Sequence, residues 1–325
     1  MVKGSKGLTA SNAVAVIDDI EVPALVEEAG NNAKFAWDEF LYGALSNAHT
    51  RRSYGKAVGD LLKAADDAGL SLAQISPKFI RKYLEQMSVS IPTKKLRLSA
   101  MKNFFDLAVT RHAVPLNPAL SVRGERYSVI EGKTPEITVS QVRKLIKVCD
   151  ENSLIGLRDK TIISTLIYTA ARVGAVVNLS VEDFSQSGEQ AVLKFGEKGG
   201  KAREIPVRSD LQALIRAYIE RSQVGLSKSS PLFRSAKGKC DELTERGLTA
   251  NNVRDMIKRR LKQAKLPGNF SPHSFRVCAL TDLLKQEIPR EDVQYLAGHA
   301  DARTTSLYDR RSRKVTRNIV ERISV

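Results

Sequence analysis

Apolar residues recur at intervals of three and four along most of the chain, and this spacing predicts a largely α-helical protein. Residues 50–68 form one such segment. Residues 76–87 form a second, with Ser76 as N-cap and Pro77 as the first helical residue. The pattern repeats once more after Pro92, so the first half of the chain predicts a small helical bundle.

The helical spacing stops at residues 115–138, which contain three prolines, so this stretch predicts a linker between two domains. Thr138 and Gln141 have the spacing of a capping box and predict the start of a new helix. A long apolar helix is expected to follow at Leu154–Ala170.

Two β features interrupt the helices of the second half. Residues 190–207 predict a β-hairpin with a flexible tip at GEKGG, and Pro231–Phe233 predicts one short strand. A length of 325 residues favours two domains. The predicted fold class is therefore mainly α with a small antiparallel β-sheet. Its parts are a flexible N-terminal arm at 1–33, a helical domain at 34–120, a linker at 121–134, and an α-rich domain with a C-terminal tail helix at 135–325.

Lysine and arginine far outnumber aspartate and glutamate, which gives a formal net charge of +16 and a pI near 9.8. Such an excess predicts a polyanion as the partner. No apolar run is long enough to span a bilayer, and the first residues lack the pattern of a secretory signal, so no membrane partner is expected. The odd number and wide spacing of Cys149, Cys240 and Cys278 predict reduced thiols in a cytoplasmic protein, not disulfides or a zinc site.

Two histidines, an arginine and a tyrosine stand out near the C-terminus: His273, Arg276, His299 and Tyr308. With Ser271 as N-cap, His273 and Arg276 share the first turn of a helix, where backbone N–H groups also favour an anion such as phosphate. Each of the four also has an ordinary explanation as a local cap, a salt-bridge partner or an exposed amphipathic side chain. Their combination is what indicates a site.

These residues and two stretches before them resemble the tyrosine recombinases, the phage-integrase type that includes Cre and the Xer proteins. The family has an Arg in a T-G-x-R turn, a Lys in a G-K-G-x-K-x-R-x-V-P hairpin, H-x-x-R, and G-H followed after nine residues by the nucleophilic Tyr. The matching residues occur here in the same order. They are Arg172 in YTAARV, Lys198 in FGEKGGKAREIPV with Lys201 as the alternative, His273, Arg276, His299 and Tyr308.

Three positions depart from the family pattern. Ala175 stands where members usually have an acidic residue, Val277 where they often have His, and Ala170 where T-G-x-R has Gly. These positions support the chemistry in the family and do not perform it. The departures therefore concern how firmly Arg172 and the phosphate pocket are held.

The resemblance implies a site-specific recombinase that cleaves and rejoins DNA through a 3′-phosphotyrosyl intermediate and a Holliday junction, with no cofactor, metal or ATP. Arg172 and Arg276 would hold the non-bridging phosphate oxygens. His273 and His299 would add donors or take the proton of Tyr308. Lys198 would protonate the leaving 5′-oxygen. The sequence itself has no cluster of carboxylate, His or Cys residues at metal-ligand spacing.

The resemblance also implies a two-domain C-shaped clamp around DNA. Its parts are a core-binding, SAM-like domain at 34–120 and a catalytic tyrosine recombinase domain at 135–325. The expected partner is double-stranded DNA with inverted-repeat half-sites, bound by a homotetramer that joins two duplexes through the C-terminal tail helix. Val315, Ile319 and Ile323 give that tail an apolar stripe, and packing against its own domain is the alternative.

Basic side chains predict where the DNA backbone is held. The helix that follows Thr249 is the expected major-groove element, with a solvated basic face as the alternative. The predicted DNA-contact residues are Arg51, Arg52, Lys56, Lys94, Lys95, Arg97, Lys102, Lys201, Arg203, Arg254, Lys258, Arg259 and Lys262.

Two other functions remain open at this point. A type IB topoisomerase or a telomere resolvase would use the same chemistry. A DNA-binding regulator would keep the fold without catalysis, and the complete set of six catalytic positions argues against it.

Overall fold

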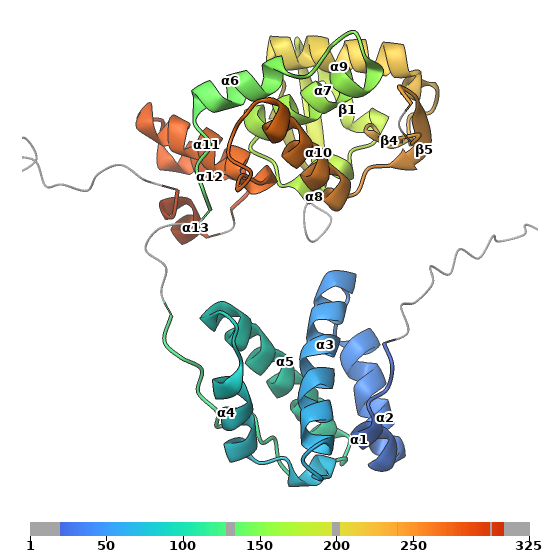
Figure 1. Cartoon of the computed structure of the whole chain (residues 1–325), viewed down its shortest axis with the longest axis vertical. Coiled ribbons are helices and arrows are strands. Elements are labelled where there is room, and N and C mark those ends of the chain that lie inside the picture. The colour runs from blue at the N-terminus through green and yellow to red at the C-terminus, as the bar shows by residue number, and fades with distance from the viewer. Residues whose placement is uncertain (1–19, 128–133, 197–201, 239, 300, 309–325) are drawn as a thin grey trace, which may run out of the picture. The chain divides into compact units, whose positions relative to one another are not determined.

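The computed structural model describes residues 20–127, 134–196, 202–238, 240–299 and 301–308 (Figure 1). It consists of two compact units, Met1–Ser128 and Val129–Val325, and the boundary between them falls inside the linker predicted at 121–134. The described residues are mainly helical with a small antiparallel sheet, which confirms the predicted fold class. No helix among them is long and apolar enough to cross a membrane.

The first unit is a helical bundle around an aromatic core. Trp37, Phe40 and Phe104 are buried, and their ring centroids lie 5.7 to 6.0 Å apart. Such contacts contribute beyond the burial of their area. The unit contains α1 (Ala24–Glu28), α2 (Asn31–Asp38), a π-helical turn (Glu39–Gly43), α3 (Ala48–Asp66), a 3-10 turn (Leu72–Gln74), α4 (Pro77–Gln86) and α5 (Ile91–Thr110).

The predicted flexible arm is too long. It was expected to extend to residue 33, but α1 and the start of α2 lie within that range. Leu25 and Val26 are buried in the core of the first unit. Burial of these two apolar side chains holds the segment in place. The first part of the expected arm, residues 1–19, lies outside the described residues.

The local helix signals in this unit are confirmed. Ser76 caps α4, since its side-chain oxygen accepts from Phe79 N at 3.2 Å, and Pro77 is the first helical residue. The helix predicted at residues 50–68 is α3, which begins two residues earlier because the side chain of Asn47 accepts from the free N–H groups of His49 and Thr50.

The second unit is built around α7, which contributes buried side chains on several sides, among them Leu157, Ile162 and Leu166. A three-stranded antiparallel sheet has the order β1-β2-β3, and β4 pairs with β5. The helices are α6 (Val139–Lys147), α7 (Leu154–Tyr168), α8 (Val173–Val177), α9 (Ser209–Ser222), α10 (Ala250–Gln263), α11 (Pro272–Lys285), α12 (Arg290–Ala297) and α13 (Ala302–Ser306). The strands are β1 (Phe184–Ser187), β2 (Gln190–Gly196), β3 (Ala202–Pro206), β4 (Arg234–Ala236) and β5 (Leu243–Gly247), with 3-10 turns at Val181–Asp183 and Val224–Leu226.

Helix and hairpin predictions for this unit are largely confirmed. Thr138 and Gln141 form the capping box of α6, and the long apolar helix is α7. The predicted hairpin is β2 and β3, which pair antiparallel with Lys194 opposite Glu204. Its tip, residues 197–201 with Lys198 and Lys201, lies outside the described residues.

The remaining strands were not predicted correctly. Pro231–Phe233 does not form a strand, and only Pro231 pairs, in an isolated bridge with Ser180. The strand β1 and the pair β4–β5 were missed. They span three to five residues each and are rich in polar side chains, so their apolar alternation is too short to recognise.

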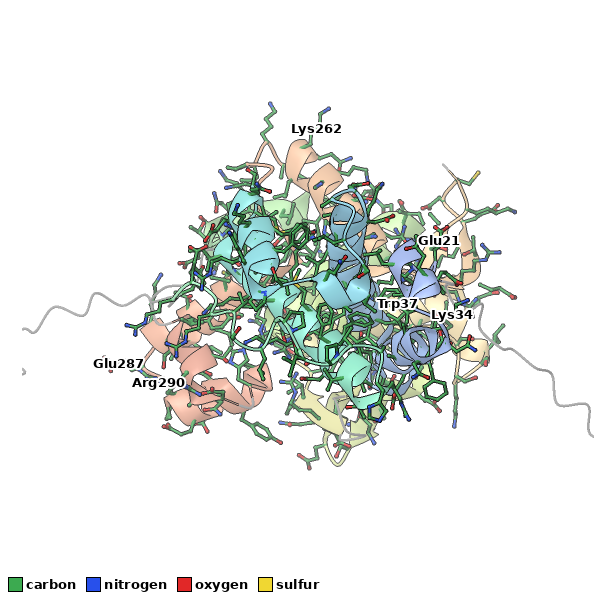
Figure 2. The ribbon with its side chains drawn as sticks, turned by 90° about the horizontal axis from the view of Figure 1, so that it is seen from below. Glu21, Lys34, Trp37, Lys262, Glu287 and Arg290 are labelled. Atoms are coloured by element: carbon green, nitrogen blue, oxygen red, sulfur yellow. The ribbon has the colours of Figure 1, made fainter. Side chains whose placement is uncertain are left out.

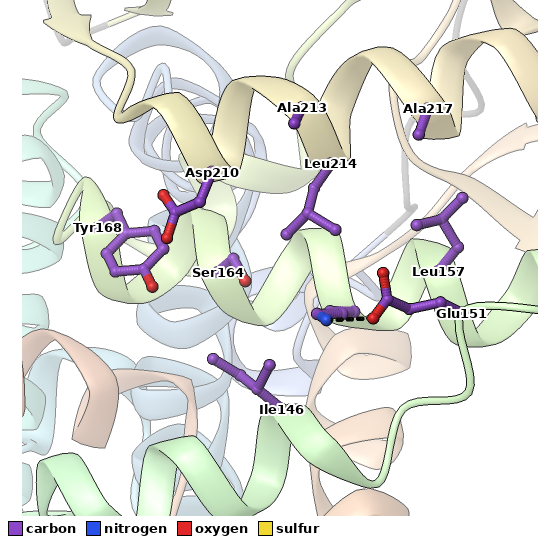
Figure 3. Close-up of a pocket in the computed structure, with 10 residues that line it drawn as sticks. Ile146, Glu151, Leu157, Ser164, Tyr168, Asp210, Ala213, Leu214 and Ala217 are labelled. Atoms are coloured by element: carbon purple, nitrogen blue, oxygen red, sulfur yellow. Dashed lines mark hydrogen bonds and ion pairs between the residues drawn. The ribbon is translucent and has the colours of Figure 1, made fainter.

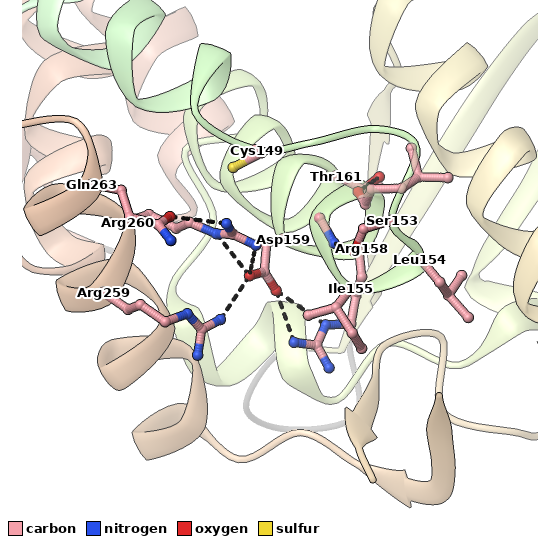
Figure 4. Close-up of polar contacts among 12 residues, drawn as sticks. Cys149, Ser153, Leu154, Ile155, Arg158, Asp159, Thr161, Arg259, Arg260 and Gln263 are labelled. Carbon is pink, nitrogen blue, oxygen red and sulfur yellow. Dashed lines mark hydrogen bonds and ion pairs between the residues drawn. The ribbon is translucent and has the colours of Figure 1, made fainter. Parts of the chain in front are cut away.

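One buried carboxylate joins α7 to α10 (Figure 4). Asp159 is fully buried and accepts hydrogen bonds from three guanidinium groups: Arg158 at 2.8 Å, Arg259 at 2.9 Å and Arg260 at 2.7 Å. One negative charge among three positive charges leaves this cluster with an excess of two positive charges. Removing one partner of a buried ion pair typically costs about 3–5 kcal/mol, so Asp159 stabilises the docking of α10 on the central helix.

Two hollows of the second unit lie along α6. The first, of about 470 Å³, lies between α6, α7 and α9 and is lined by apolar side chains such as Ile146, Leu157 and Leu214 (Figure 3). The second, of about 460 Å³, is lined by residues of α6, α11 and other elements. No predicted catalytic residue among those that the structure describes lines either hollow. The candidate site is therefore identified from its side chains and not from a cavity.

Candidate active site

The site is centred on a buried arginine of α11. That helix begins as predicted, with Ser271 as N-cap and Pro272 as its first residue. One turn later Arg276 is 1% exposed. Its Nη1 donates to the carbonyl of Ala170 at 2.5 Å, and its Nη2 donates to the carbonyl of Ala297 at 2.7 Å. The guanidinium thus ties the end of α7 and the end of α12 to α11.

Arg276 carries a buried positive charge that no carboxylate of the described residues neutralises. No ion pair involves it within the part of the chain that the structure describes, and its Nε makes no hydrogen bond there. Burial lowers its pKa, and a side-chain hydrogen bond with Tyr308 acts in the opposite direction. A buried cation without a counter-charge is costly. An anionic group of a ligand would supply the missing charge.

Tyr308 lies beside this arginine and is 8% exposed. Its hydroxyl is 3.3 Å from Nε2 of His273, and its ring stacks on His299 with a centroid distance of 5.4 Å. Its backbone carbonyl accepts from Thr281 Oγ1 at 3.1 Å. Contacts on the backbone, ring and hydroxyl therefore hold the phenol next to both histidines.

The contacts of His299 determine its tautomer. Arginine has only N–H donors, so His299 Nε2, which is 2.5 Å from Arg276 Nη2, must accept. The proton of the neutral ring then lies on Nδ1, which donates to Thr305 Oγ1 at 2.9 Å. Burial, and then the positive charges of Arg276 and Arg172, lower the His299 pKa to about 4. The ring is neutral at pH 7.

Because the His299 pKa is lowered in the folded protein, the stability of the fold decreases as the pH falls. The folded state prefers the neutral imidazole, so the stabilisation is complete above the ordinary histidine pKa of 6.5 and is lost as the pH falls towards 4. Protonation would turn Nε2 from an acceptor into a donor facing another donor, Arg276.

Replacing Thr305 with valine is expected to disturb this arrangement while keeping the side-chain shape. His299 Nδ1–H would lose its acceptor, and a buried donor left without a partner costs about 1–3 kcal/mol. We expect the free energy of unfolding to fall by that amount and the Nε2–H tautomer to appear in ¹⁵N NMR spectra of the ring. Thr304→Val, at the half-buried neighbouring position, is the matched control. An unchanged tautomer in Thr305→Val would contradict the assignment.

His273 and Arg172 complete the cluster. Burial lowers the pKa of His273, and the positive charges of Arg276 and Arg172 lower it further. His273 Nε2 is therefore a neutral nitrogen facing the Tyr308 hydroxyl at neutral pH. Arg172 is the exposed N-cap residue of α8, and its charge also acts on His299. The structure thus brings four of the six predicted catalytic residues into contact, and Arg172 is near enough for its charge to act on both histidines. Lys198 lies outside the described residues.

Ala170 explains why a glycine suits this turn. Its φ is +49°, in the left-handed region, and it is fully buried with its carbonyl on Arg276. A non-glycine residue there is strained by about 1–2 kcal/mol. The strained turn directs the Ala170 carbonyl to the guanidinium, so this departure from the family pattern leaves the contact intact.

Two substitutions at position 170 should differ in how much they change the stability of the fold. Ala170→Gly is expected to change the free energy of unfolding by less than about 1 kcal/mol, because relieved strain offsets the lost methyl group and the freer unfolded chain. Ala170→Val is expected to destabilise by about 2 kcal/mol or more, because a β-branched residue fits neither the backbone conformation nor the packed site. Urea unfolding of both variants measures the difference. Equal stability of the two variants would show that the left-handed conformation is not required.

Several cations predicted to contact DNA in the first unit make contacts within it. Arg51 donates to the carbonyl of Leu41 at 2.9 Å and stacks over Tyr42. The ion pairs are Lys56 and Arg97 with Asp60, and Lys94 with Glu125. The side chains of Arg52 and Lys95 are exposed, and that of Lys102 is half-buried. Exposed pairs such as that of Lys56 are weak, so these side chains can exchange partners for phosphates.

The second unit also contains both exposed cations and cations that make contacts within the protein. Arg254, Lys258 and Lys262 are exposed on α10, and Lys262 projects outward near its end (Figure 2). Arg259 is held by Asp159 but keeps 52% of its side chain exposed. Arg203 of β3 donates to main-chain carbonyls of α12, namely those of Tyr295 and Leu296. The predicted DNA contacts of these residues stay predictions, and Lys201 lies outside the described residues.

Sequence reasoning missed the residues that position the others. The partner of His299 is Thr305, which the sequence analysis did not assign to the site. The acceptor for three arginines is Asp159, and its only signal was the charged run of residues 158–160 within the otherwise apolar helix α7. The contact of Arg203 with α12 joins residues 93 positions apart, and no sequence spacing indicates it.

Two family profiles match the chain. The phage integrase family matches residues 135–314, and the N-terminal SAM-like domain of phage integrases matches residues 36–112. Tyrosine recombinase XerD of Ralstonia nicotianae is 29% identical over 230 residues, which are 70% of this chain and 71% of that protein. Tyrosine recombinase XerC of Pelobacter propionicus is 27% identical over 232 residues, 70% of this chain and 72% of that protein.

Solved structures share the fold. XerH site-specific recombinase bound to palindromic difH substrate matches with a TM-score of 0.65 at 18% identity, over 83% of this chain and 78% of that chain. A lambda integrase dimer bound to a COC′ core site matches with a TM-score of 0.63 at 17% identity, over 87% of this chain and 97% of that chain. The integrase profile alone spans more than half of the sequence. The chain therefore belongs to the phage integrase family and is a tyrosine recombinase.

Proposed function

We propose that the protein is a site-specific DNA recombinase that breaks and rejoins DNA through a covalent bond between Tyr308 and a 3′-phosphate. The observation that carries the proposal is the cluster itself. A buried guanidinium without a carboxylate partner, that of Arg276, lies beside a phenol that faces a neutral imidazole, that of His273. A phosphodiester supplies the anion that this cluster lacks, and the phenol supplies a nucleophile.

The first step transfers a DNA strand to the protein. Tyr308 Oη attacks the phosphorus, a new O–P bond forms, and the bond from phosphorus to the 5′-oxygen breaks. His273 Nε2, 3.3 Å from the hydroxyl, takes the phenol proton. Arg276 and Arg172 stabilise the extra negative charge on the non-bridging oxygens. Lys198 donates a proton to the leaving 5′-oxygen.

His299 positions Arg276 in this mechanism. As the Nδ1–H tautomer it accepts from Arg276 through Nε2, and its ring stacks on Tyr308. It therefore orients the guanidinium and the nucleophile with the same imidazole. Reversal of the first step with a 5′-hydroxyl from another duplex rejoins strands, because the phosphotyrosine bond conserves the energy of the original bond.

The assembly that we propose is a homotetramer on two duplexes with inverted-repeat half-sites, acting through a Holliday junction. The formal net charge of +16 supports tight, salt-sensitive binding to the DNA backbone. The apolar stripe of Val315, Ile319 and Ile323 supports the tail as the contact between subunits, and this tail lies outside the described residues.

Covalent capture tests the proposal. The probe is a pool of nicked duplexes with randomised inverted half-sites of about 11–13 base pairs, in which the leaving strand is lost after cleavage. We expect a protein–DNA adduct that survives detergent and denaturing electrophoresis and is enriched in one sequence. Sequence-specific binding without an adduct would instead identify a regulator. Relaxation of supercoiled plasmid without site preference would identify a topoisomerase.

A further inference from the structure

The C-terminal end of α12 is held by two arginines from different parts of the fold. Arg203 of β3 donates through Nη1 to the carbonyls of Tyr295, at 3.3 Å, and Leu296. Arg276 of α11 donates to the next carbonyl, that of Ala297. The last carbonyls of a helix have no partners within it and form the negative end of its dipole. Both guanidiniums therefore complete the helix end that leads into Gly298 and His299.

Arg203 is placed to connect the β2–β3 hairpin with the catalytic cluster. It belongs to the strand that leaves the hairpin tip, and the tip contains Lys198. Its charge acts on both Arg276 and His299. Its guanidinium also lies over the ring of Phe195 on the facing strand β2, at 5.9 Å. Because Arg203 contacts both the facing strand β2 and the end of α12, it fixes the position of the β2–β3 strands relative to α12.

We propose that Arg203 is a positioning residue that holds the β2–β3 strand pair and the His299 turn in one arrangement for strand cleavage. This inference rests on the proposed recombinase function. It assigns to Arg203 a role within the protein in place of the DNA-backbone contact expected from its charge. Its effect passes through Arg276 and His299, and it touches no reacting atom.

The test compares Arg203→Ala and Arg203→Lys with a matched control. Arg221 of α9 also donates through its guanidinium to two consecutive carbonyls, those of Glu151 and Asn152, at a site that contains no predicted catalytic residue. Arg221→Ala therefore removes the same charge and the same kind of contact. The probe is a nicked duplex recovered from the covalent capture, and the readouts are adduct rate at saturating DNA, DNA affinity and its salt dependence.

We expect Arg203→Ala to slow adduct formation by about tenfold to a hundredfold, since displacement of catalytic groups by about 1 Å can cost about a hundredfold. Arg203→Lys keeps the charge but has a shorter reach and no planar guanidinium over the Phe195 ring, so its rate should fall in between. Arg221→Ala should react at the wild-type rate. All three variants should bind DNA within about twofold of the wild type with the same salt slope. A wild-type rate for Arg203→Ala would overturn the inference. So would a lower affinity and a shallower salt slope with an unchanged rate, because Arg203 would then contact phosphate directly.

The pH dependence separates positioning from general support of the fold. The groups whose charges lower the His299 pKa are Arg276, Arg172, His273 and Arg203. Removing the Arg203 charge should raise the His299 pKa only part of the way from about 4, because burial and the charges of Arg276 and Arg172 are larger causes and remain, whereas Arg203→Lys and Arg221→Ala should leave it in place. The acid limb of the pH–rate profile of Arg203→Ala should therefore move to higher pH.

NMR titration of the His299 ring in DNA-free protein gives the same test without activity. If the wild type forms no adduct, the proposed function fails, and the titration still decides the role of Arg203. An unchanged His299 pKa in folded Arg203→Ala would then reject the connection between β3 and the His299 turn.

Discussion

Replacing Tyr308 with phenylalanine is expected to abolish covalent capture of DNA, to below about 10⁻⁴ of the wild-type rate, because no other group takes over from a lost nucleophile. DNA binding should persist. The phosphate contacts come from arginines and lysines, and none of these is changed. The measurement is adduct formation on the nicked duplex, with affinity followed in parallel.

The fold should tolerate this substitution. The phenylalanine ring keeps the stacking on His299 and the packing with the apolar cluster around Leu280 and Leu284. The lost hydroxyl removes one hydrogen bond, to His273, which is worth about 0.5–1.5 kcal/mol. Thermal unfolding of the variant should therefore remain cooperative, and an inactive protein can be attributed to the missing oxygen.

Tyr295→Phe is the matched control. This tyrosine lies on α12, four residues before His299, and is 70% exposed. The same chemical change there should leave adduct formation unaltered. Adduct formation by Tyr308→Phe at the rate of Tyr295→Phe would remove the phenol from the mechanism and with it the proposed function.

Local chemistry made much of the fold predictable. Ser76 with Pro77, Thr138 with Gln141, and Ser271 each begin a helix where the sequence predicts one. These signals act within four residues, so the sequence contains both partners of each contact. The hairpin β2–β3 was equally predictable from the sequence because a glycine-rich tip separates two apolar runs.

Contacts between distant residues were not predictable in this way. Arg276 and the Ala170 carbonyl are 106 positions apart, and Arg260 and Asp159 are 101 apart. Family spacing identified Arg276 as part of a site but gave no acceptor for its guanidinium. It gave no tautomer for His299 either, since that depends on Thr305 and Arg276 together. A sequence shows which residues can bond, and only the fold decides which do.

The flexible arm predicted at residues 1–33 is an error of another kind, because part of that segment is ordered. Residues 20–33 are short of regular spacing, so the sequence offered no amphipathic face to recognise. Leu25 and Val26 nevertheless pack into the first core, because five helical residues suffice once a bundle is present to receive them.

Arg276→Lys is expected to be the most damaging change that keeps the charge of the site. Arginine holds Ala170, Ala297 and His299 at once through two nitrogens, and a lysine ammonium on a single flexible stem cannot reproduce that fork. Loss of one preorganised donor to the phosphate costs on the order of 10²–10³ in rate. We expect the adduct rate at saturating DNA to fall by at least that factor.

Stability should fall as well, and the control must account for this. Carbonyls left unpaired in the buried site cost about 1–3 kcal/mol each. Arg260→Lys is the matched variant, because Arg260 is 8% exposed and donates two hydrogen bonds to Asp159, away from Tyr308. It should lower the unfolding temperature comparably, yet form adduct at the wild-type rate per folded molecule.

Comparing Arg276→Lys with Arg260→Lys separates the effect of guanidinium geometry on the adduct rate from the effect of lost stability. Rates are measured at a temperature where circular dichroism shows both proteins folded. If Arg276→Lys then cleaves as fast as Arg260→Lys, positive charge alone is sufficient at this position, and the three-way contact with Ala170, Ala297 and His299 is a feature of the fold without a part in catalysis. A deficit confined to Arg276→Lys means that the phosphate is held by a guanidinium whose direction the protein fixes before DNA arrives.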